Sequence, residues 1–425
     1  MIKIKRFICA FLCFSLIFST VGIAAFASDG EEDEYFSDEQ LEYYASLGLQ
    51  GTTLNVYNWG EYISDGSEGS MDVISEFERL TGIKVNYTNF ESNENMYSKL
   101  SGGGVSYDVI VPSDYMVERL IDEDMLLELD YDNIPNMQYI REDCLNLPFD
   151  PEQKYSVCFN TGYTILIYNK TLVKEEPDSW SVLWDEQYKD KVLMFNNSRD
   201  AFAIAQLLLG QSLNTTSEQD WVDAAELLAK QKDAVNPVYV MDEVFNLMES
   251  GEYAFATYYA GDYVLMNENN EDLGFVYPKE GVNAFYDAFC IPKCAQNKAG
   301  AEAFINFMHE PEVAFENEEY IYYASSNATV MENEESSLFE NEAVYPEEEP
   351  KNEVFCNLPQ NILELQNNLW SKVKSGNLSV NNKLNEKKIY IASGCVAGVS
   401  AVLLAFAYIN KRRKKKEQDL SDLYE

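Results

Sequence analysis

Short apolar runs alternate with amphipathic stretches along the middle of the chain, and this alternation indicates its fold class. Residues 54–57 and 83–87 are predicted strands because β-branched and aromatic side chains recur within a few positions. Residues 71–80 form a predicted helix because Val73 and Phe77 recur at helical spacing. Strands that alternate with helices predict a parallel sheet with short crossovers, the α/β class. The same alternation predicts helices at 94–100, 202–209 and 221–230, and strands at 109–111, 164–168, 192–195 and 253–258.

A longer apolar run lies at the start of the chain. Lys3, Lys5 and Arg6 precede it, and it begins at Phe7 and ends in the sequence Ala-Phe-Ala. A basic start, an apolar core and a small-x-small site are typical of a secretory signal peptide, here residues 1–27. The alternative is that this run stays uncleaved as an anchor helix.

A second long apolar run lies near the end of the chain. Residues 389–410 carry no charge, and at ~1.5 Å per residue they span a hydrocarbon core of about 30 Å. Basic residues follow at once, so residues 411–425 are a predicted cytoplasmic tail. Residues 28–51 are rich in carboxylates and form a predicted spacer or loosely attached helix. We therefore expect a single-pass protein of the cell membrane whose globular body lies on the extracellular side.

Composition narrows the classes of function. The chain has 425 residues, of which 46% are hydrophobic, and this is enough for two ordinary domains. A formal net charge of -41 argues against a nucleic-acid partner, because phosphates require clustered lysine and arginine. The charge permits a cationic ligand but does not identify one, because acidic residues also serve solubility alone. His309 is the only histidine, so histidine-based catalysis would depend on it alone. We expect no enzymatic activity, no metal site and no cofactor.

Three loops that follow predicted strands combine aromatic, polar and acidic side chains. They comprise residues 58–62, 112–115 and 196–200. Ligands of open α/β sheets bind at loops beyond the carboxyl ends of the strands. Aromatic rings give cation–π contacts of about 0.5–2 kcal/mol each, and carboxylates neutralise a desolvated ammonium group. The residues by themselves therefore indicate an exported α/β protein that binds a cationic or polar ligand.

Several segments resemble the substrate-binding subunit of spermidine/putrescine ABC transporters. The resemblance runs from about residue 54 to residue 376, nearly the whole globular body. Its most specific motifs are the two that contain ESNENMYSKL and YDVIVPS. The matching segments are YNWGEY at 57–62, TGIKVNY at 81–87, FESNENMYSKL at 90–100, YDVIVPSDYMV at 107–117, SWSVLWDEQYKDKVLM at 179–194 and YPKEG at 277–281.

This resemblance implies a type II periplasmic-binding-protein fold, in which two α/β lobes with a hinge close on a ligand cleft between them. Residues 52–161 and 287–333 are the implied first lobe, and residues 162–286 and 334–378 the second. The implied function is the capture of polyamines for an ABC transporter, whose permease and ATPase subunits are separate chains. Matched residue by residue, the implied ligand contacts are Trp59, Glu61, Tyr62, Ser113, Tyr115, Asn197, Asp200, Tyr259, Asp262, Phe285, Asp287 and Tyr323.

The chain departs from the family pattern at several of these positions. Asn197 stands where the spermidine binders have an aspartate, so one anionic anchor is lost. We therefore expect putrescine to bind at least as tightly as spermidine. Gly60 lacks the threonine side chain of relatives, and Phe285 and Tyr259 each replace a tryptophan.

Two other functions compete with polyamine binding. The first is ferric iron binding on the same fold, because two pairs of adjacent tyrosines, at 258–259 and 322–323, offer phenolate ligands that suit a hard cation. The second is an enzyme or adhesin that acts at the cell surface, although no nucleophile–base pair is visible in the sequence.

Overall fold

The strands of the protein form one mixed sheet. The computed structural model describes residues 35–333, 336 and 338–378. The sheet has the order β2-β1-β3-β9-β4-β7-β5-β6, with β8 and β10 added to β4 and β11 added to β9. The strands are β1 (Thr53–Trp59), β2 (Lys84–Phe90), β3 (Val109–Ile110), β4 (Ser156–Asn169), β5 (Val192–Phe195), β6 (Val238–Val240), β7 (Phe255–Tyr259), β8 (Leu273–Val276), β9 (Val282–Cys290), β10 (Ala324–Ser325) and β11 (Asn352–Val354).

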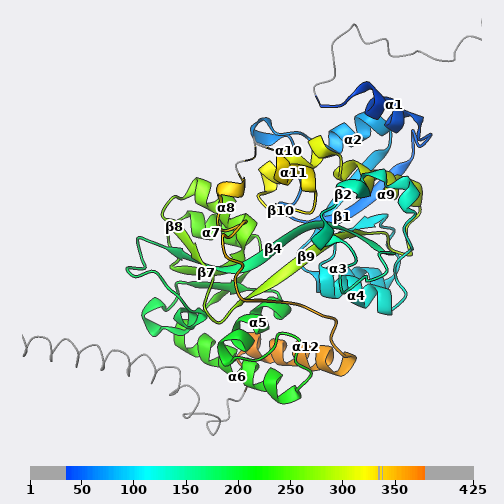
Figure 1. The fold of residues 1–425 in the computed structure, drawn as a ribbon. Coiled ribbons are helices and arrows are strands. Elements are labelled where there is room, and N and C mark those ends of the chain that lie inside the picture. Colours follow the sequence, from blue (N-terminus) through cyan, green and yellow to red (C-terminus); the bar gives the residue numbers. More distant parts are fainter. Residues whose placement is uncertain (1–34, 334–335, 337, 379–425) are drawn as a thin grey trace, which may run out of the picture.

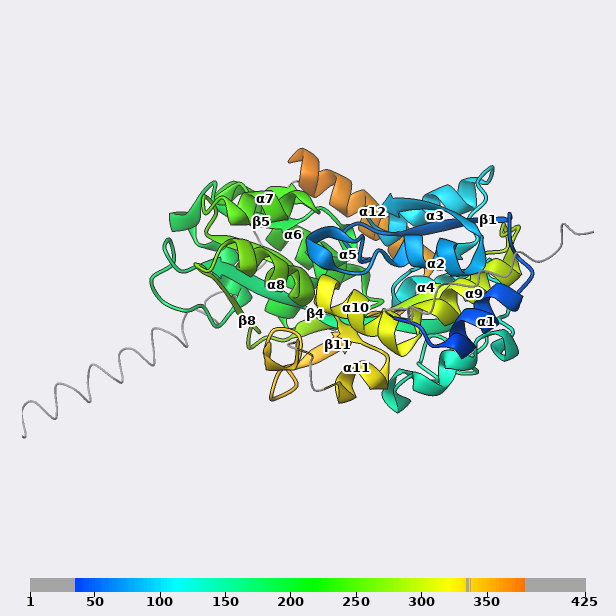
Figure 2. The same cartoon turned by 90° about the horizontal axis from the view of Figure 1, so that it is seen from above.

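The helices gather in two groups at the two ends of this sheet (Figures 1 and 2). One group surrounds β1 to β3 and contains α2, α3, α4 and α9, and the other surrounds β5 to β7 and contains α5 to α8 and α12. The helices are α1 (Asp38–Ser46), α2 (Val73–Thr81), α3 (Asn93–Gly102), α4 (Asp114–Asp122), α5 (Ser198–Leu209), α6 (Glu218–Val235), α7 (Glu243–Glu249), α8 (Ala260–Asn269), α9 (Lys298–Met308), α10 (Pro311–Ile321), α11 (Ala328–Glu332) and α12 (Gln360–Ser375).

Two long antiparallel strands, β4 and β9, join the two groups. They pair over most of their length, with Thr161 opposite Tyr286 and Gly162 opposite Phe285. The second part of β4 also pairs with β7 and β8, while the carboxyl end of β9 reaches β3. Figure 1 shows both strands crossing the middle of the molecule. Each strand therefore has one end in each half.

The helices next to β1 follow the sequence pattern closely. Asp72 caps α2 by accepting from Ser75 N at 2.9 Å, and Val73 and Phe77 are fully buried. Ser92 caps α3 by accepting from Asn95 N at 3.1 Å. Polar caps fix where each helix begins, and the apolar face then packs on the sheet. The predicted α/β class is confirmed.

The predicted parallel sheet is correct within each half and wrong between them. β1 is parallel to β2 and β3, and β5 is parallel to β6 and β7. In the centre, β4 is antiparallel to β9 and β7. The sequence pattern did not reveal β9, whose residues are nearly all buried and therefore show no alternation of polar and apolar positions.

Part of the predicted acidic spacer, residues 28–51, packs against the body as α1. Tyr44 is fully buried, and its hydroxyl donates to Glu310 Oε1 at 2.6 Å. Ser37 forms a capping box with Gln40 at the start of the helix. This segment is attached to the body because two aromatic side chains among its carboxylates, Phe36 and Tyr44, pack on Phe307 of α9.

No helix within residues 35–378 that the structure describes is long and apolar enough to cross a membrane. The predicted signal peptide at 1–27, the predicted membrane span at 389–410 and the predicted tail at 411–425 lie outside the described residues.

Candidate functional site

A pocket lies between the two halves, where several strands end. Loops that follow β1, β3, β5 and β7 reach it together with the middle of β9. The backbones of Ser113 and Asp287 form an isolated antiparallel bridge there, which ties the loop after β3 to β9. Strand ends from both halves therefore line one space, as the position of the aromatic and acidic loops in the sequence predicts.

Asp287 lies on β9 and accepts hydrogen bonds from the first half of the molecule. Tyr62 Oη donates to Asp287 Oδ2 at 2.8 Å, and Ser113 Oγ donates to Asp287 Oδ1 at 2.6 Å. Ser113 is the N-cap residue of α4, yet its side chain makes no capping bond. Its hydroxyl instead donates to Asp287, and this bond fixes the orientation of the carboxylate in the pocket.

Asp200 and Asp262 come from the second half and also lie beside tyrosines. Tyr259 Oη donates to Asp200 Oδ2 at 3.0 Å, and Asn197 Nδ2 donates to the same oxygen at 2.6 Å. The phenol of Tyr323 lies close to Asp262 and lowers the pKa of that carboxyl. A tyrosine therefore lies beside each of the three buried carboxylates, and its hydroxyl favours the ionised form.

Burial raises the pKa of all three carboxylates. Desolvation raises the pKa of Asp287 to about 6 and that of Asp200 to about 7, and it raises the pKa of Asp262 well above its usual range. Their exposed fractions are 4%, 4% and 8%. Within the described part of the chain, none of the three forms an ion pair with lysine or arginine. A ligand that brought positive charge would supply this missing partner.

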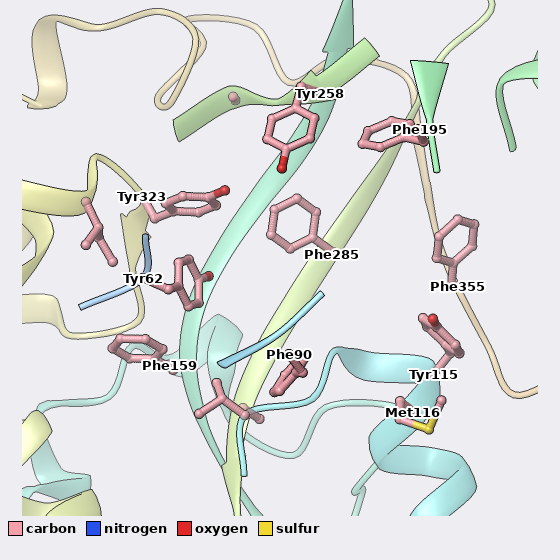
Figure 3. Close-up of a cluster of buried hydrophobic side chains, with 14 of the residues drawn as sticks. Tyr62, Phe90, Tyr115, Met116, Phe159, Phe195, Tyr258, Phe285, Tyr323 and Phe355 are labelled. Carbon is pink, nitrogen blue, oxygen red and sulfur yellow. The ribbon is translucent and has the colours of Figure 1, made fainter. Parts of the chain in front are cut away.

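Aromatic rings form the rest of the pocket wall. Trp59 Nε1 donates to Val111 O at 2.9 Å, which holds the indole in place. The rings of Tyr259 and Phe285 pack edge to face at 5.4 Å between centroids. A Cβ atom on residue 162 would lie 2.6 Å from Phe285 Cζ, so Gly162 on β4 leaves the space that this ring needs. Figure 3 shows the hydroxyls of Tyr62, Tyr258 and Tyr323 pointing toward the space around Phe285.

The structure brings eleven of the twelve predicted contact residues to this pocket. Glu61 is the one that does not line it. Its φ is 45°, in the left-handed region, and its exposed side chain faces an outer hollow next to the pocket, although Trp59 and Tyr62 on either side of it do line the pocket. The eleven are Trp59, Tyr62, Ser113, Tyr115, Asn197, Asp200, Tyr259, Asp262, Phe285, Asp287 and Tyr323.

Several other lining residues were not predicted as polyamine contacts. They are Gly60, Asn93, Met241, Asp242, Phe245, Tyr258, Asn283 and Phe355. Asn93 donates to Ser113 Oγ at 3.1 Å. Because it belongs to the ESNENMYSKL motif, that motif could have identified it as a pocket residue. Asp242 follows β6, a strand of only three residues that the apolar pattern does not reveal.

The adjacent tyrosines that suggested ferric iron do not all reach the pocket, because Tyr322 lines the outer hollow instead. Tyr258 donates to Asp242 at 3.1 Å and Tyr259 donates to Asp200. Tyr322 donates to Glu268 at 2.6 Å, whereas Tyr323 lies close to Asp262. The four phenols thus lie beside four different carboxylates, an arrangement that does not favour a shared phenolate site for iron.

Comparison with known proteins gives a consistent result. Residues 72–343 match the family model described as bacterial extracellular solute-binding protein. The chain is 33% identical over 312 residues to spermidine/putrescine-binding periplasmic protein 1 of Haemophilus influenzae, covering 73% of this chain and 85% of that protein. It is 32% identical over 327 residues to the spermidine/putrescine-binding periplasmic protein of Escherichia coli, covering 76% of this chain and 92% of that protein.

The fold is also that of solved substrate-binding proteins. The chain is similar to the spermidine/putrescine ABC transporter substrate-binding protein PotD of Streptococcus pneumoniae, solved with calcium and HEPES. The TM-score is 0.64 and the identity 33%, over 77% of this chain and 100% of that chain. The predicted periplasmic-binding-protein fold, with two lobes and a cleft between them, is confirmed.

Proposed function

The chain belongs to the family of bacterial extracellular solute-binding proteins, and we propose that it binds polyamines, putrescine and spermidine, for an ABC transporter. One observation carries this proposal. Asp200, Asp262 and Asp287 are buried in one aromatic pocket, each beside a tyrosine. Ammonium groups would neutralise these carboxylates, and the methylene chain between ammonium groups would pack on the rings.

The proposed contacts divide into two kinds. Asp287, Asp200 and Asp262 are the proposed partners of the ligand's positive charges. Ser113 orients Asp287, and Asn197 orients Asp200. The aromatic residues are the walls that accept methylene and ammonium groups. They are Trp59, Tyr62, Tyr115, Tyr259, Phe285 and Tyr323.

We infer that the two halves act as the lobes of a hinged clamp. Residues 52–161 with 287–333 are the proposed first lobe, and residues 162–286 with 334–378 the second. The pairing of Thr161 with Tyr286 supports this division, because both proposed junctions then lie side by side on β4 and β9. A bend at these strands would open the pocket, and closure would exclude water from the charges. The proposed partners are a permease and an ATPase, and the proposed role is transport without catalysis.

The proposed location rests on the sequence outside the described residues. A signal peptide at 1–27 would export the chain, and the uncharged segment at 389–410 would hold it in the cell membrane as a single span. The basic residues after that segment support a cytoplasmic tail, which leaves the binding body on the extracellular side.

A thermal-shift panel tests the proposed ligand class. The purified protein is heated with putrescine, spermidine, cadaverine, ferric iron or a neutral sugar, each in excess. A ligand at 100 times its Kd stabilises the folded state by about 2.7 kcal/mol. We expect the polyamines to raise the melting temperature and the sugar to leave it unchanged. A shift with ferric iron together with visible absorption, or no shift with any polyamine, would contradict the proposal.

A further inference from the structure

Asp242 stands at the mouth of the pocket, where the pocket meets the outer hollow. It lines both spaces, together with Phe245. Its side chain remains exposed, unlike those of the three inner carboxylates. Asp242 is the N-cap residue of α7, but its carboxylate makes no capping bond to that helix. Instead, Asp242 Oδ1 accepts from Tyr258 Oη at 3.1 Å, so the side chain is turned toward the pocket.

Gly60 provides the space that Asp242 occupies. A Cβ atom on residue 60 would lie 2.5 Å from Asp242 Oδ2, closer than atoms that are not bonded approach each other. Gly60 comes from the loop after β1 in one half, and Asp242 from the loop after β6 in the other. The φ of Gly60 lies outside the left-handed region, so the backbone does not require glycine there. The absence of the side chain is what admits the carboxylate.

The described surroundings of Asp242 are acidic. Glu243 and Glu91 repel its ionised form, and Glu61 and Glu249 line the same outer hollow. Among the described residues, lysine and arginine form no ion pair with Asp242. A carboxylate that is oriented by Tyr258 and admitted by Gly60, at the open end of a cation pocket, is suited to receive a positive group of the ligand.

We propose that Asp242 and Gly60 form an outer subsite that binds a terminal ammonium group of a triamine such as spermidine. This inference rests on the proposed polyamine function. A diamine has two ammonium groups, and Asp287 on one side with Asp200 and Asp262 together on the other would match them. A triamine is longer and carries a third charge, and its far end would reach toward the mouth. The outer subsite thus supplies an anionic partner in a chain that has Asn197 in place of an acidic residue.

The test compares ligands of different charge on the full-length protein in detergent. Calorimetry gives the Kd of putrescine, spermidine and a monoacetylated spermidine, which lacks one terminal charge. Asp242→Asn should weaken spermidine binding by about fivefold, the upper end of the range for one partly exposed charge pair, and putrescine binding by less than about twofold. Gly60→Ala should act in the same way, because the added Cβ displaces the carboxylate without removing it. Acetylation should lower the affinity of the wild type more than that of Asp242→Asn.

Glu249→Gln is the matched control. Glu249 lies on α7 and lines the outer hollow but not the pocket. Its substitution therefore removes the same charge without changing the pocket. If Asp242→Asn and Glu249→Gln weaken spermidine equally, the effect is general electrostatic attraction and the subsite is overturned. It is also overturned if Asp242→Asn weakens putrescine as much as spermidine, or changes neither. A wild type that binds no polyamine would overturn the proposed function itself, a result distinct from these.

Discussion

Tyr62 Oη donates to Asp287 Oδ2 at 2.8 Å, which joins the loop after β1 to the centre of β9. Both side chains are buried, and Ser113 holds the second oxygen of the carboxylate. These bonds favour the ionised form, whereas burial disfavours it and raises the pKa of Asp287 to about 6. The carboxylate is therefore oriented for a cation before one arrives, and it lacks a positive partner within the described residues.

Substitution of this anchor gives the first prediction. Asp287→Asn keeps the size of the side chain and removes its charge, so an ammonium group loses its partner in a closed pocket. Such losses cost about 2–5 kcal/mol, or about 30- to 5,000-fold in Kd. We expect putrescine and spermidine both to bind more weakly by at least the lower figure, measured by calorimetry.

Two controls accompany this variant. Tyr62→Phe removes one hydrogen bond and keeps the charge of Asp287. It should therefore weaken the free energy of polyamine binding by only about 1 kcal/mol. The melting temperature of ligand-free Asp287→Asn should equal or exceed that of the wild type at pH 7.5, because an unpaired buried carboxylate is removed. Full polyamine affinity in Asp287→Asn would show that this residue is not an anchor.

The aromatic walls give the second prediction. Trp59→Ala and Tyr259→Ala each remove a face on which methylene and ammonium groups can pack. We expect a loss of about 1–3 kcal/mol in each, roughly 5- to 150-fold in Kd. Tyr259→Phe retains the ring and loses only the bond to Asp200, so it should bind more tightly than Tyr259→Ala. If both alanine variants fold and bind like the wild type, these rings serve only to pack the protein.

The strands and loops that carry most of the pocket can be predicted because their signals are local. The strands at 54–57 and 192–195 are dense in apolar residues, and the aromatic and acidic side chains follow within a few positions. Parallel strands end at the same edge, so these loops meet without any further information. The caps at Asp72 and Ser92 likewise act over three residues.

What the sequence does not reveal depends on contacts between distant segments. Asp242 follows a strand of three residues, and its relation to Gly60 exists only where the two halves meet. Glu61 lies between two pocket residues in the sequence, yet its positive φ is associated with a side chain outside the pocket. The strand β9 is buried on both faces, so it lacks the alternating pattern of a half-exposed strand.

Membrane attachment gives the third prediction. The segment at 389–410 is the only uncharged run of more than 20 residues outside the predicted signal peptide. A chain that stops before Lys388 should therefore be released into the medium, while the full chain remains in the membrane fraction. Immunoblots of both fractions measure this. A truncated chain that stays with the membrane would show that residues 1–27 are retained or that another attachment exists.

The free energy of unfolding should fall as the pH rises, because two buried carboxylates have raised pKa values. The pKa values of Asp200 and Asp287 in the folded, ligand-free protein are about 7 and about 6, against ~4 for an aspartate in an unfolded chain. The folded state thus holds these protons more tightly. The stability that the two groups contribute is fully present below pH ~4 and is lost as the pH rises through 6 and 7.

Polyamine binding should have the opposite dependence on pH. A bound ammonium group favours the ionised carboxylates, so binding releases the protons of Asp200 and Asp287 when the pH is low. At pH 5 these protons would weaken the apparent Kd by up to about 1,000-fold relative to pH 8, from about two units at Asp200 and about one at Asp287. Calorimetry in two buffers of different ionisation enthalpy measures both the Kd and the protons released. Asp287→Asn should lose the part of this dependence centred near pH 6 and keep the part near pH 7. An affinity that is equal at pH 5 and pH 8, with no proton release, would mean that the cation does not meet these two carboxylates.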